Sequence, residues 1–394
     1  MAESHEKPDP FALRPYVGLS LAYVGIFGHL GIVMPAFALW IDGRGYGTMA
    51  IGMLLALPAL AKMATPWTWG KWSDRHGSTT RWMIVAAILS TLALLCFPLE
   101  RSLPVLFVLM AIYGFCRAPL LPLLEATALR WSAGGAFRYG PVRLWGSLAF
   151  AATSILFGLL WAAGVRDGIL WVAAGGLVLC GGTARLMLAG GPTSSPPSER
   201  RGFEPWAARE RRLFFLVCAL MQASHAAYYG FYSLHLTRAG YDGSDIGILW
   251  ALAIVAEVIV LFRLDRWVDR IGTVSMMRFA LLVAAARWVW IGFASHWWEF
   301  AAAQLLHAAT YAVFHVAAIH HVDRGFGVAR RTQAQALYSG VSFGLGLSMG
   351  SLIVGWAASH WGLPLVFRGA AVVPLLAVLL LSLSRGRGPA DASG

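Results

Sequence analysis

The chain has 394 residues, of which 58% are apolar and only 13% are charged, about half the charged share of a soluble domain. This composition excludes an ordinary water-soluble globule and indicates a chain surrounded by lipid. The formal charge of +12 is spread over short segments between long apolar stretches, so it forms no basic domain and excludes a nucleic-acid partner.

Twelve apolar stretches are long enough to cross a hydrocarbon layer of about 30 Å, for which a helix needs roughly 20 residues. We expect the spans at 15–40, 48–69, 82–99, 103–129, 142–163, 168–184, 213–236, 246–262, 274–294, 297–320, 334–358 and 363–383. Because a helix satisfies its own backbone hydrogen bonds in lipid, the sequence predicts an all-α membrane protein.

Basic residues give the orientation of these spans. Of the 31 Lys and Arg, 23 lie at the two ends of the chain or in and beside the segments after even-numbered spans, whereas five lie in or beside the other connections and three lie deep inside spans. Cytoplasmic segments carry the excess of basic residues, so both termini are predicted to be cytoplasmic.

A short motif occurs once in each half of the chain. Residues 70–77 read GKWSDRHG and residues 265–272 read DRWVDRIG, with the matching Asp residues 195 positions apart. The polar segment 190–212 separates spans 6 and 7, so we expect an N-terminal six-helix bundle (1–189), a cytoplasmic linker (190–212) and a C-terminal six-helix bundle (213–394) as parallel repeats.

Both copies of the motif are expected to act mechanically. Asp and Arg side chains that bond neighbouring helix ends would latch the cytoplasmic side, and the closing glycine permits a tight turn. This hypothesis assigns gating to Gly70, Asp74, Arg75, Gly77, Asp269, Arg270 and Gly272, and the alternative is simple capping of the connecting segments.

The motif resembles the signature of the major facilitator superfamily, Gly-x-x-x-Asp-Arg-x-Gly after helix 2, although Ser78 and Thr79 replace its usual basic residues. Segments 139–150, 222–236, 249–260 and 304–317, among them YGPVRLWGSLAF and QLLHAATYAVFHVA, resemble the phenylpropionate permease group, relatives of the lactose permease type of proton symporter. The resemblance implies two parallel six-helix repeats that work by alternating access.

Pairs of charged residues extend this resemblance. Glu125 and Arg143 are 18 residues apart, and Arg287 and His307 are 20 apart, spacings similar to those of the pairs that lactose permease uses for sugar binding and proton coupling. Arg143 and Glu125 are expected to bind polar substrate groups, because a guanidinium offers a two-donor fork that a Lys lacks. Alternatively, Arg143 only extends toward the membrane surface.

Charged side chains at mid-bilayer cost about 3 kcal/mol or more, so those inside spans face the bundle interior or water. Glu257 matches a functional acid of the family, and we expect it to bind the coupled proton while Arg287 switches between it and His307. A permanent ion pair is the alternative. The position that carries the proton-handling Glu of lactose permease is Thr310 here, which indicates that coupling is organised differently.

Two stripes of polar and aromatic residues are predicted to line a cavity for a ring-bearing solute. Each recurs at helical spacing along one face of its span, and they comprise Gln304, His307, Tyr311 and His315 in the tenth span, and Gln222, His225, Tyr229 and Tyr232 in the seventh. We assign substrate binding to Gln222, His225, Tyr229, Tyr232 and Tyr311, with helix-to-helix hydrogen bonding as the alternative.

Two further cations lie inside spans. Arg117 is expected to be either a partner of Glu125 or a substrate ligand. Lys62 is expected to extend to the membrane surface or to pair with Glu125, and it is given no role.

The sequence therefore predicts a secondary transporter of a bacterial inner membrane that is not an enzyme, has no metal site and uses the proton gradient in place of a cofactor. Proton symport of a small organic solute is favoured, and the resemblance suggests an aromatic carboxylate such as a phenylpropionate-like acid. A sugar or nucleoside symporter, a proton-antiport exporter and a non-transporting membrane sensor remain alternatives. The expected partners are the substrate, protons and the lipid bilayer, and the protein is expected to be a monomer.

Overall fold

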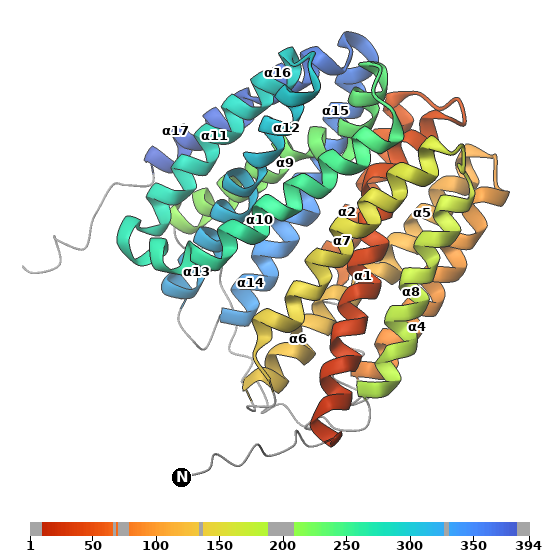
Figure 1. Ribbon diagram of the computed structural model, residues 1–394. Coiled ribbons are helices and arrows are strands. Elements are labelled where there is room, and N and C mark those ends of the chain that lie inside the picture. The colour runs from red at the N-terminus through yellow and green to blue at the C-terminus, as the bar shows by residue number, and fades with distance from the viewer. Residues whose placement is uncertain are drawn as a thin grey trace, which may run out of the picture.

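The computed structural model describes residues 10–65, 68–69, 79–133, 137–187, 209–326 and 331–383, and each regular element within these ranges is a helix (Figure 1). The first half contains α1 (Pro10–Asp42), α2 (Thr48–Thr65), α4 (Thr79–Cys96), η2 (Phe97–Leu99), α5 (Leu103–Arg117), α6 (Leu120–Ala133), α7 (Tyr139–Ala162) and α8 (Gly168–Met187). The second half contains α9 (Arg209–Arg238), α10 (Gly243–Ile271), α11 (Thr273–Phe293), α12 (Trp297–Leu305), η3 (Ala309–Val313), α13 (Phe314–Phe326), α14 (Arg331–Ser339), η5 (Gly340–Gly346), α15 (Leu347–Trp361), α16 (Leu363–Ala370) and α17 (Val372–Leu383).

In the described ranges, eleven helical runs are long and apolar enough to cross a membrane, and α2 supplies one shorter apolar helix over Thr48–Ala64. Each coincides with one of the twelve predicted spans. The prediction of a multi-pass, all-α membrane protein is therefore confirmed.

Three spans are less regular than the sequence predicted. The fourth is divided into α5 and α6 next to Pro119, because proline has no N–H for the helix ladder and its ring displaces the preceding turn. The tenth and eleventh contain the π-helical turns η3 and η5. Such turns are rare and frequently mark functional sites.

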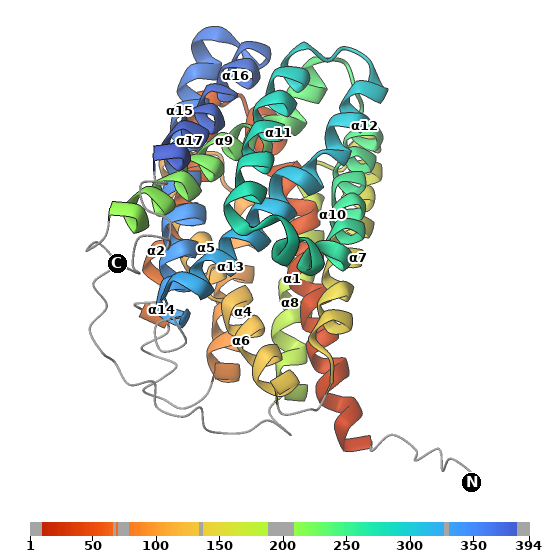
Figure 2. The ribbon, with the colours of Figure 1, turned by 90° about the vertical axis from the view of Figure 1, so that its left-hand side faces the viewer.

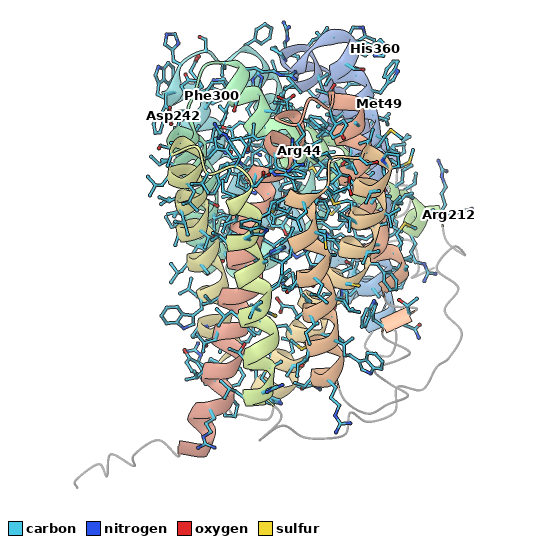
Figure 3. All side chains as sticks on the ribbon, turned by 90° about the vertical axis from the view of Figure 1, so that its right-hand side faces the viewer. Arg44, Met49, Arg212, Asp242, Phe300 and His360 are labelled. Atoms are coloured by element: carbon cyan, nitrogen blue, oxygen red, sulfur yellow. The ribbon has the colours of Figure 1, made fainter. Side chains whose placement is uncertain are left out.

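Within the first half α1 packs against α7 and α8, and in the second half α9 packs against α15 and α17. The two halves meet along two helix pairs, α7 with α10 and α2 with α15. Figures 1 and 2 both show α7 and α10 side by side. We call the end of the bundle where α1 begins the near end. The other end, where Figure 3 shows Arg44, Asp242 and His360, is the far end.

Glycines bring the backbones of the two halves into contact close to the far end. A Cβ atom on Gly52 of α2 would lie 2.8 Å from Cα of Gly355 on α15, and one on Gly247 of α10 would lie 3.0 Å from Cα of Gly158 on α7. Larger residues would push these helices apart. Gly52 and Gly247 are 195 residues apart, the offset of the repeated Asp-Arg motif, so each repeat contributes the same contact.

Ion pairs also hold the far end together. Arg238 at the end of α9 lies 3.2 Å from Asp42 at the end of α1, which joins the two halves. Arg44 donates to Asp167 at 2.7 Å, and Trp40 donates to the same carboxylate at 2.9 Å. Burial raises the pKa of Asp167, but the hydrogen bonds from Arg44 and Trp40 outweigh it and hold this pKa below its usual value.

The second copy of the repeated motif corrects one prediction. It lies between the predicted spans 246–262 and 274–294, which implies a connecting loop, but α10 continues to Ile271, because Leu264 and Val268 are buried on one helix face. Gly272 then ends the helix with φ of 81°, a left-handed backbone that favours glycine, so the predicted tight turn is present there.

The first copy of the motif, with Gly70, Asp74, Arg75 and Gly77, lies outside the described residues, as does most of the segment 190–212. Arg270 is exposed in the last turn of α10, next to Asp269. The gating roles and the division at 190–212 stay predictions.

Candidate functional site

Glu125 of α6 and Arg143 of α7 are brought together in the first half. Nε of Arg143 lies 3.4 Å from Oε1 of Glu125, and the Tyr139 hydroxyl donates a hydrogen bond to Oε2. The two charged side chains are 28% and 26% exposed, so both are accessible. The guanidinium also lies 4.0 Å from the centre of the Phe27 ring on α1. The predicted pair is therefore present, within reach of solvent and beside an aromatic ring.

Arg287 of α11 lies in the interior of the second half and is fully buried. Its Nε donates to the Ala303 carbonyl at 2.7 Å, Nη2 to Oε1 of Gln304 at 2.7 Å, and Nη1 to Oγ1 of Thr310 at 3.3 Å. The guanidinium carbon lies 4.5 Å from the centre of the Tyr228 ring. All these partners are neutral, so no ion pair compensates the positive charge of the guanidinium. In a low-dielectric environment this charge attracts any carboxylate nearby.

His307 lies between Arg287 and the acid Glu257 of α10. Nη1 of Arg287 is 3.2 Å from Nδ1 of His307, and Nε2 of His307 is 3.8 Å from Oε2 of Glu257. A guanidinium only donates hydrogen bonds, so Nδ1 must accept and the imidazole proton belongs on Nε2, facing Glu257. The imidazole is thus held neutral, with its N–H directed at the carboxyl group.

Arg287 is bonded here to His307, one of the two partners between which it is predicted to switch, and the alternative of a permanent pair with Glu257 is not seen. Arg287 and Glu257 do not form an ion pair in the structure, because His307 occupies the space between them. Thr310, which stands where lactose permease-type symporters have an acid, accepts from Arg287 instead. The Glu257 side chain is 14% exposed, whereas Arg287 is inaccessible.

The predicted stripe on the tenth span is a column of stacked rings. The Tyr311 ring lies 5.5 Å from that of His307 with 12° between the planes, and 5.6 Å from that of His315 with 6° between the planes. The column continues to the eleventh span. His315 forms a hydrogen bond with the Tyr338 hydroxyl at 3.0 Å, and the His315 ring lies 5.9 Å from the Phe343 ring. Tyr311 and Phe343 are partly exposed and offer aromatic surface to a solute.

The predicted stripe on α9 is mostly packed inside the second half. Gln222, His225 and Tyr232 are at most 2% exposed, and the Tyr232 ring contacts Phe300 and Phe367 of the same half. Their assignment to substrate binding therefore stays a prediction, while the contacts seen here are with side chains of the second half. In this structure they hold the second half together.

Tyr229 is the member of that stripe that remains partly exposed. Its ring lies 6.3 Å from that of His307, edge to face. Tyr229 therefore borders the histidine of the Glu257 cluster from α9.

The sites of the two halves lie within electrostatic range of each other. The positive charge of Arg143 acts on Glu257 and on Tyr311, and the charge of Glu125 also acts on Tyr311. The described arrangement therefore brings the accessible pair of the first half, the acid of the second half and the ring column to a common region.

Sequence reasoning missed three partners in this region. Tyr139 lies four residues before Arg143 on the same helix face, a spacing that would have predicted its contact with Glu125. Gln304 and Thr310 are ligands of Arg287, and their role depends on the rotamers of two helices, for which the sequence gives no signal.

A model of the MFS_1 like family matches residues 16–368. The chain belongs to this family. It is 29% identical to the probable 3-phenylpropionic acid transporter of Escherichia coli K12 over 376 residues, which cover 90% of this chain and 97% of that protein. It is also 25% identical to the maltose permease of Geobacillus stearothermophilus, over 92% of this chain and 93% of the permease.

Solved structures agree on the fold. A mutant of the nucleoside transporter NupG superposes with a TM-score of 0.80 at 14% identity, covering 94% of this chain and 99% of that chain. A bacterial homologue of the lysosomal transporter Spinster, in an inward-facing and unoccupied conformation, gives 0.72 at 15% identity over 95% and 96% of the two chains. The fold is that of major facilitator transporters, and within the described residues it comprises eleven helices of membrane-spanning length and the shorter apolar helix of α2.

Proposed function

We propose that this transporter is a proton symporter that takes up a small aromatic carboxylate, such as a phenylpropionate-like acid, by alternating access. The similarity to the probable 3-phenylpropionic acid transporter over 97% of its length supports the substrate class. The partly exposed ring column around Tyr311 and Phe343 suits an aromatic solute.

The Glu257, His307 and Arg287 arrangement is the observation that carries proton coupling. The positive charge of Arg287 has only neutral hydrogen-bond partners, so an ionised Glu257 on the far side of His307 balances it. When Glu257 takes up a proton, this balance is lost and the site gains a net positive charge. An anionic substrate then restores neutrality, which links binding of the proton to binding of the carboxylate.

Alternating access requires the two halves to part at one end while they close at the other. The far end is held by the glycine contacts and by the ion pair between Arg238 and Asp42. The proposed orientation, with both termini in the cytoplasm of a bacterial inner membrane, places this closed end outside the cell. With this orientation, the closed far end supports a conformation in which the substrate reaches the site from the cytoplasm.

A sugar or nucleoside is the second candidate substrate class. Arg143 and Glu125 neutralise each other while remaining accessible, and such a pair suits the hydroxyl groups of an uncharged solute. The similarity to a maltose permease favours the same alternative.

Proton movement in proteoliposomes tests the proposal. A pH-sensitive dye outside vesicles that contain the purified protein reports proton entry on addition of 3-phenylpropionate, maltose or uridine. We expect external alkalinisation with 3-phenylpropionate alone, and its loss in Glu257→Gln. Asp245→Asn is the matched control, because it removes an acid from the first turn of the same helix.

Each contrary result points to a different alternative. Alkalinisation with maltose or uridine alone would replace the substrate class. Proton exit from substrate-loaded vesicles would indicate an exporter. No proton movement with any solute from a correctly folded protein would favour a membrane sensor.

A further inference from the structure

Two cations of the first half remain without an acidic partner. Lys62 lies in the last turn of α2 and Arg117 in the last turn of α5. Neither forms an ion pair or a hydrogen bond with any residue in the described ranges, and Nε of Arg117 is buried with no acceptor. The expected pairs of Lys62 or Arg117 with Glu125 are absent, because Glu125 is bound by Arg143 and Tyr139.

The fold places these two cations at the same depth. Helices α2 and α5 both begin at the far end, where the Tyr46 hydroxyl bonds the Arg101 carbonyl, so they run parallel. They approach most closely where Gly114 meets Pro58, since a Cβ atom on Gly114 would lie 2.7 Å from Cα of Pro58. One helical turn beyond this contact, α2 carries Lys62 and α5 carries Arg117.

The two positive charges act on each other. The charge of Arg117 reaches Lys62, and no acidic group among the described residues opposes it there. Two like charges at membrane depth are costly unless an anion compensates them. This juxtaposition is unexplained by helix packing and points to a binding site for an anion.

Aromatic rings lie next to the ammonium group. Nζ of Lys62 is 5.5 Å from the centre of the Phe343 ring, which in turn is 6.4 Å from the Tyr311 ring of the column. The four side chains of Lys62, Arg117, Phe343 and Tyr311 are all partly exposed. A molecule with an anionic group at one end and an aromatic ring at the other matches this order.

The other membrane-embedded arginines of the site are already engaged. Arg143 is neutralised by Glu125, and Arg287 is buried with every nitrogen donating a hydrogen bond. Binding a substrate carboxylate at either would require breaking these contacts. We infer that Lys62 and Arg117 form the carboxylate subsite, with the substrate ring against Phe343 and Tyr311, an assignment that rests on the proposed function and names the residues that select an acid.

Equilibrium binding to the purified protein tests this subsite. Radiolabelled 3-phenylpropionate is titrated, and 3-phenylpropionamide, which has the same ring and chain without the charge, serves as competitor. We expect Lys62→Gln and Arg117→Gln each to weaken binding of the acid by about tenfold or more, because each removes a charge-assisted contact. The affinity for the amide should stay within about threefold.

Two further variants separate binding from folding. Lys62→Arg keeps the charge and should retain the preference for the acid. Arg185→Gln removes a cation from the exposed face of α8 in the same half and should leave both affinities unchanged. Elution as a single peak in size-exclusion chromatography confirms that each variant is folded.

The outcomes distinguish this inference from the proposed function. If wild-type protein binds and transports the acid but Lys62→Gln and Arg117→Gln bind it equally well, the subsite is wrong and the function stands. Equal loss of acid and amide binding in these variants also overturns the subsite, because it indicates a structural role. If wild-type protein binds no aromatic acid, both the proposed substrate class and the inferred subsite are wrong.

Discussion

Each half of the transporter has an arginine near its site acid, Arg143 in the first half and Arg287 in the second. The first is paired directly with an acid, and the second is not. Arg143 lies 3.4 Å from Glu125, and both side chains are about a quarter exposed. Arg287 is inaccessible and has neutral hydrogen-bond partners, while its nearest acid, Glu257, stands beyond His307.

This difference in pairing indicates that the two halves have different roles, contact with the solute and exchange of a proton. A directly paired acid keeps its negative charge, so the first-half pair can offer donors and acceptors to a solute without changing its protonation state. An acid that is separated from its cation by a neutral imidazole is only weakly held in the ionised form, so it is free to exchange a proton. We therefore assign the polar contacts with the solute to the first half and proton exchange to the second half, which also supplies the aromatic rings of Tyr311 and Phe343.

The largest expected effect comes from removing the second-half acid. Glu257→Gln should abolish accumulation of substrate against its gradient, because the site then has no exchangeable carboxyl group. Exchange of labelled for unlabelled substrate across the membrane needs no net proton movement and should persist. Loss of exchange as well, with a folded protein, would show that Glu257 binds substrate and that the division of tasks is wrong.

Moving the acid should restore part of the function. In a Glu257→Gln background, Thr310→Glu places a carboxyl group beside Arg287, where the Thr310 hydroxyl now accepts. We expect partial recovery of proton-driven uptake, measured as initial rate under an imposed pH gradient. Thr310→Gln in the same background is the control, and recovery there too would refute a role for the charge.

A smaller effect is expected in the first half. Arg143→Lys keeps the charge beside Glu125 but loses the two-donor fork, so the apparent KM for uptake should rise by about tenfold. The pH dependence of the rate should be unchanged, because proton exchange lies elsewhere. A shifted pH profile with an unaltered KM would assign Arg143 to coupling.

The smallest effect is expected at the far end. Asp167→Asn removes the acceptor of Arg44, and it should lower the free energy of unfolding by about 1 kcal/mol or less, since Asp167 is partly exposed. The pKa of Asp167 is held low, so the contribution is present at neutral pH and is lost only as the pH falls through that lowered value. Thermal melting in detergent should show a constant difference between variant and wild type from about pH 8 to pH 5, and a smaller one below about pH 4. A difference that disappears above pH 5 would contradict the assigned cause.

Sequence reasoning located the membrane spans because long apolar stretches have one stable form in lipid. It also brought Glu125 to Arg143 and His307 to Arg287 through the spacing of a resembling family. It could not assign Tyr232, because a stripe of polar and aromatic residues indicates that a helix face is enclosed, but not whether a substrate cavity or neighbouring helices of the same half enclose it. It also missed the break at Pro119 and the pairing of Lys62 with Arg117, which requires the contact between α2 and α5.

The duplicated glycine contacts bear on how such a chain could arise. Gly52 of the first repeat meets Gly355 of the second, and Gly247, the counterpart of Gly52, meets Gly158 in the first. The interface is therefore isologous, the kind of self-complementary surface that joins two identical subunits about a twofold axis. A half-length ancestor would already have carried both sides of this contact, so two separate copies could close one end of a shared pathway before they were fused.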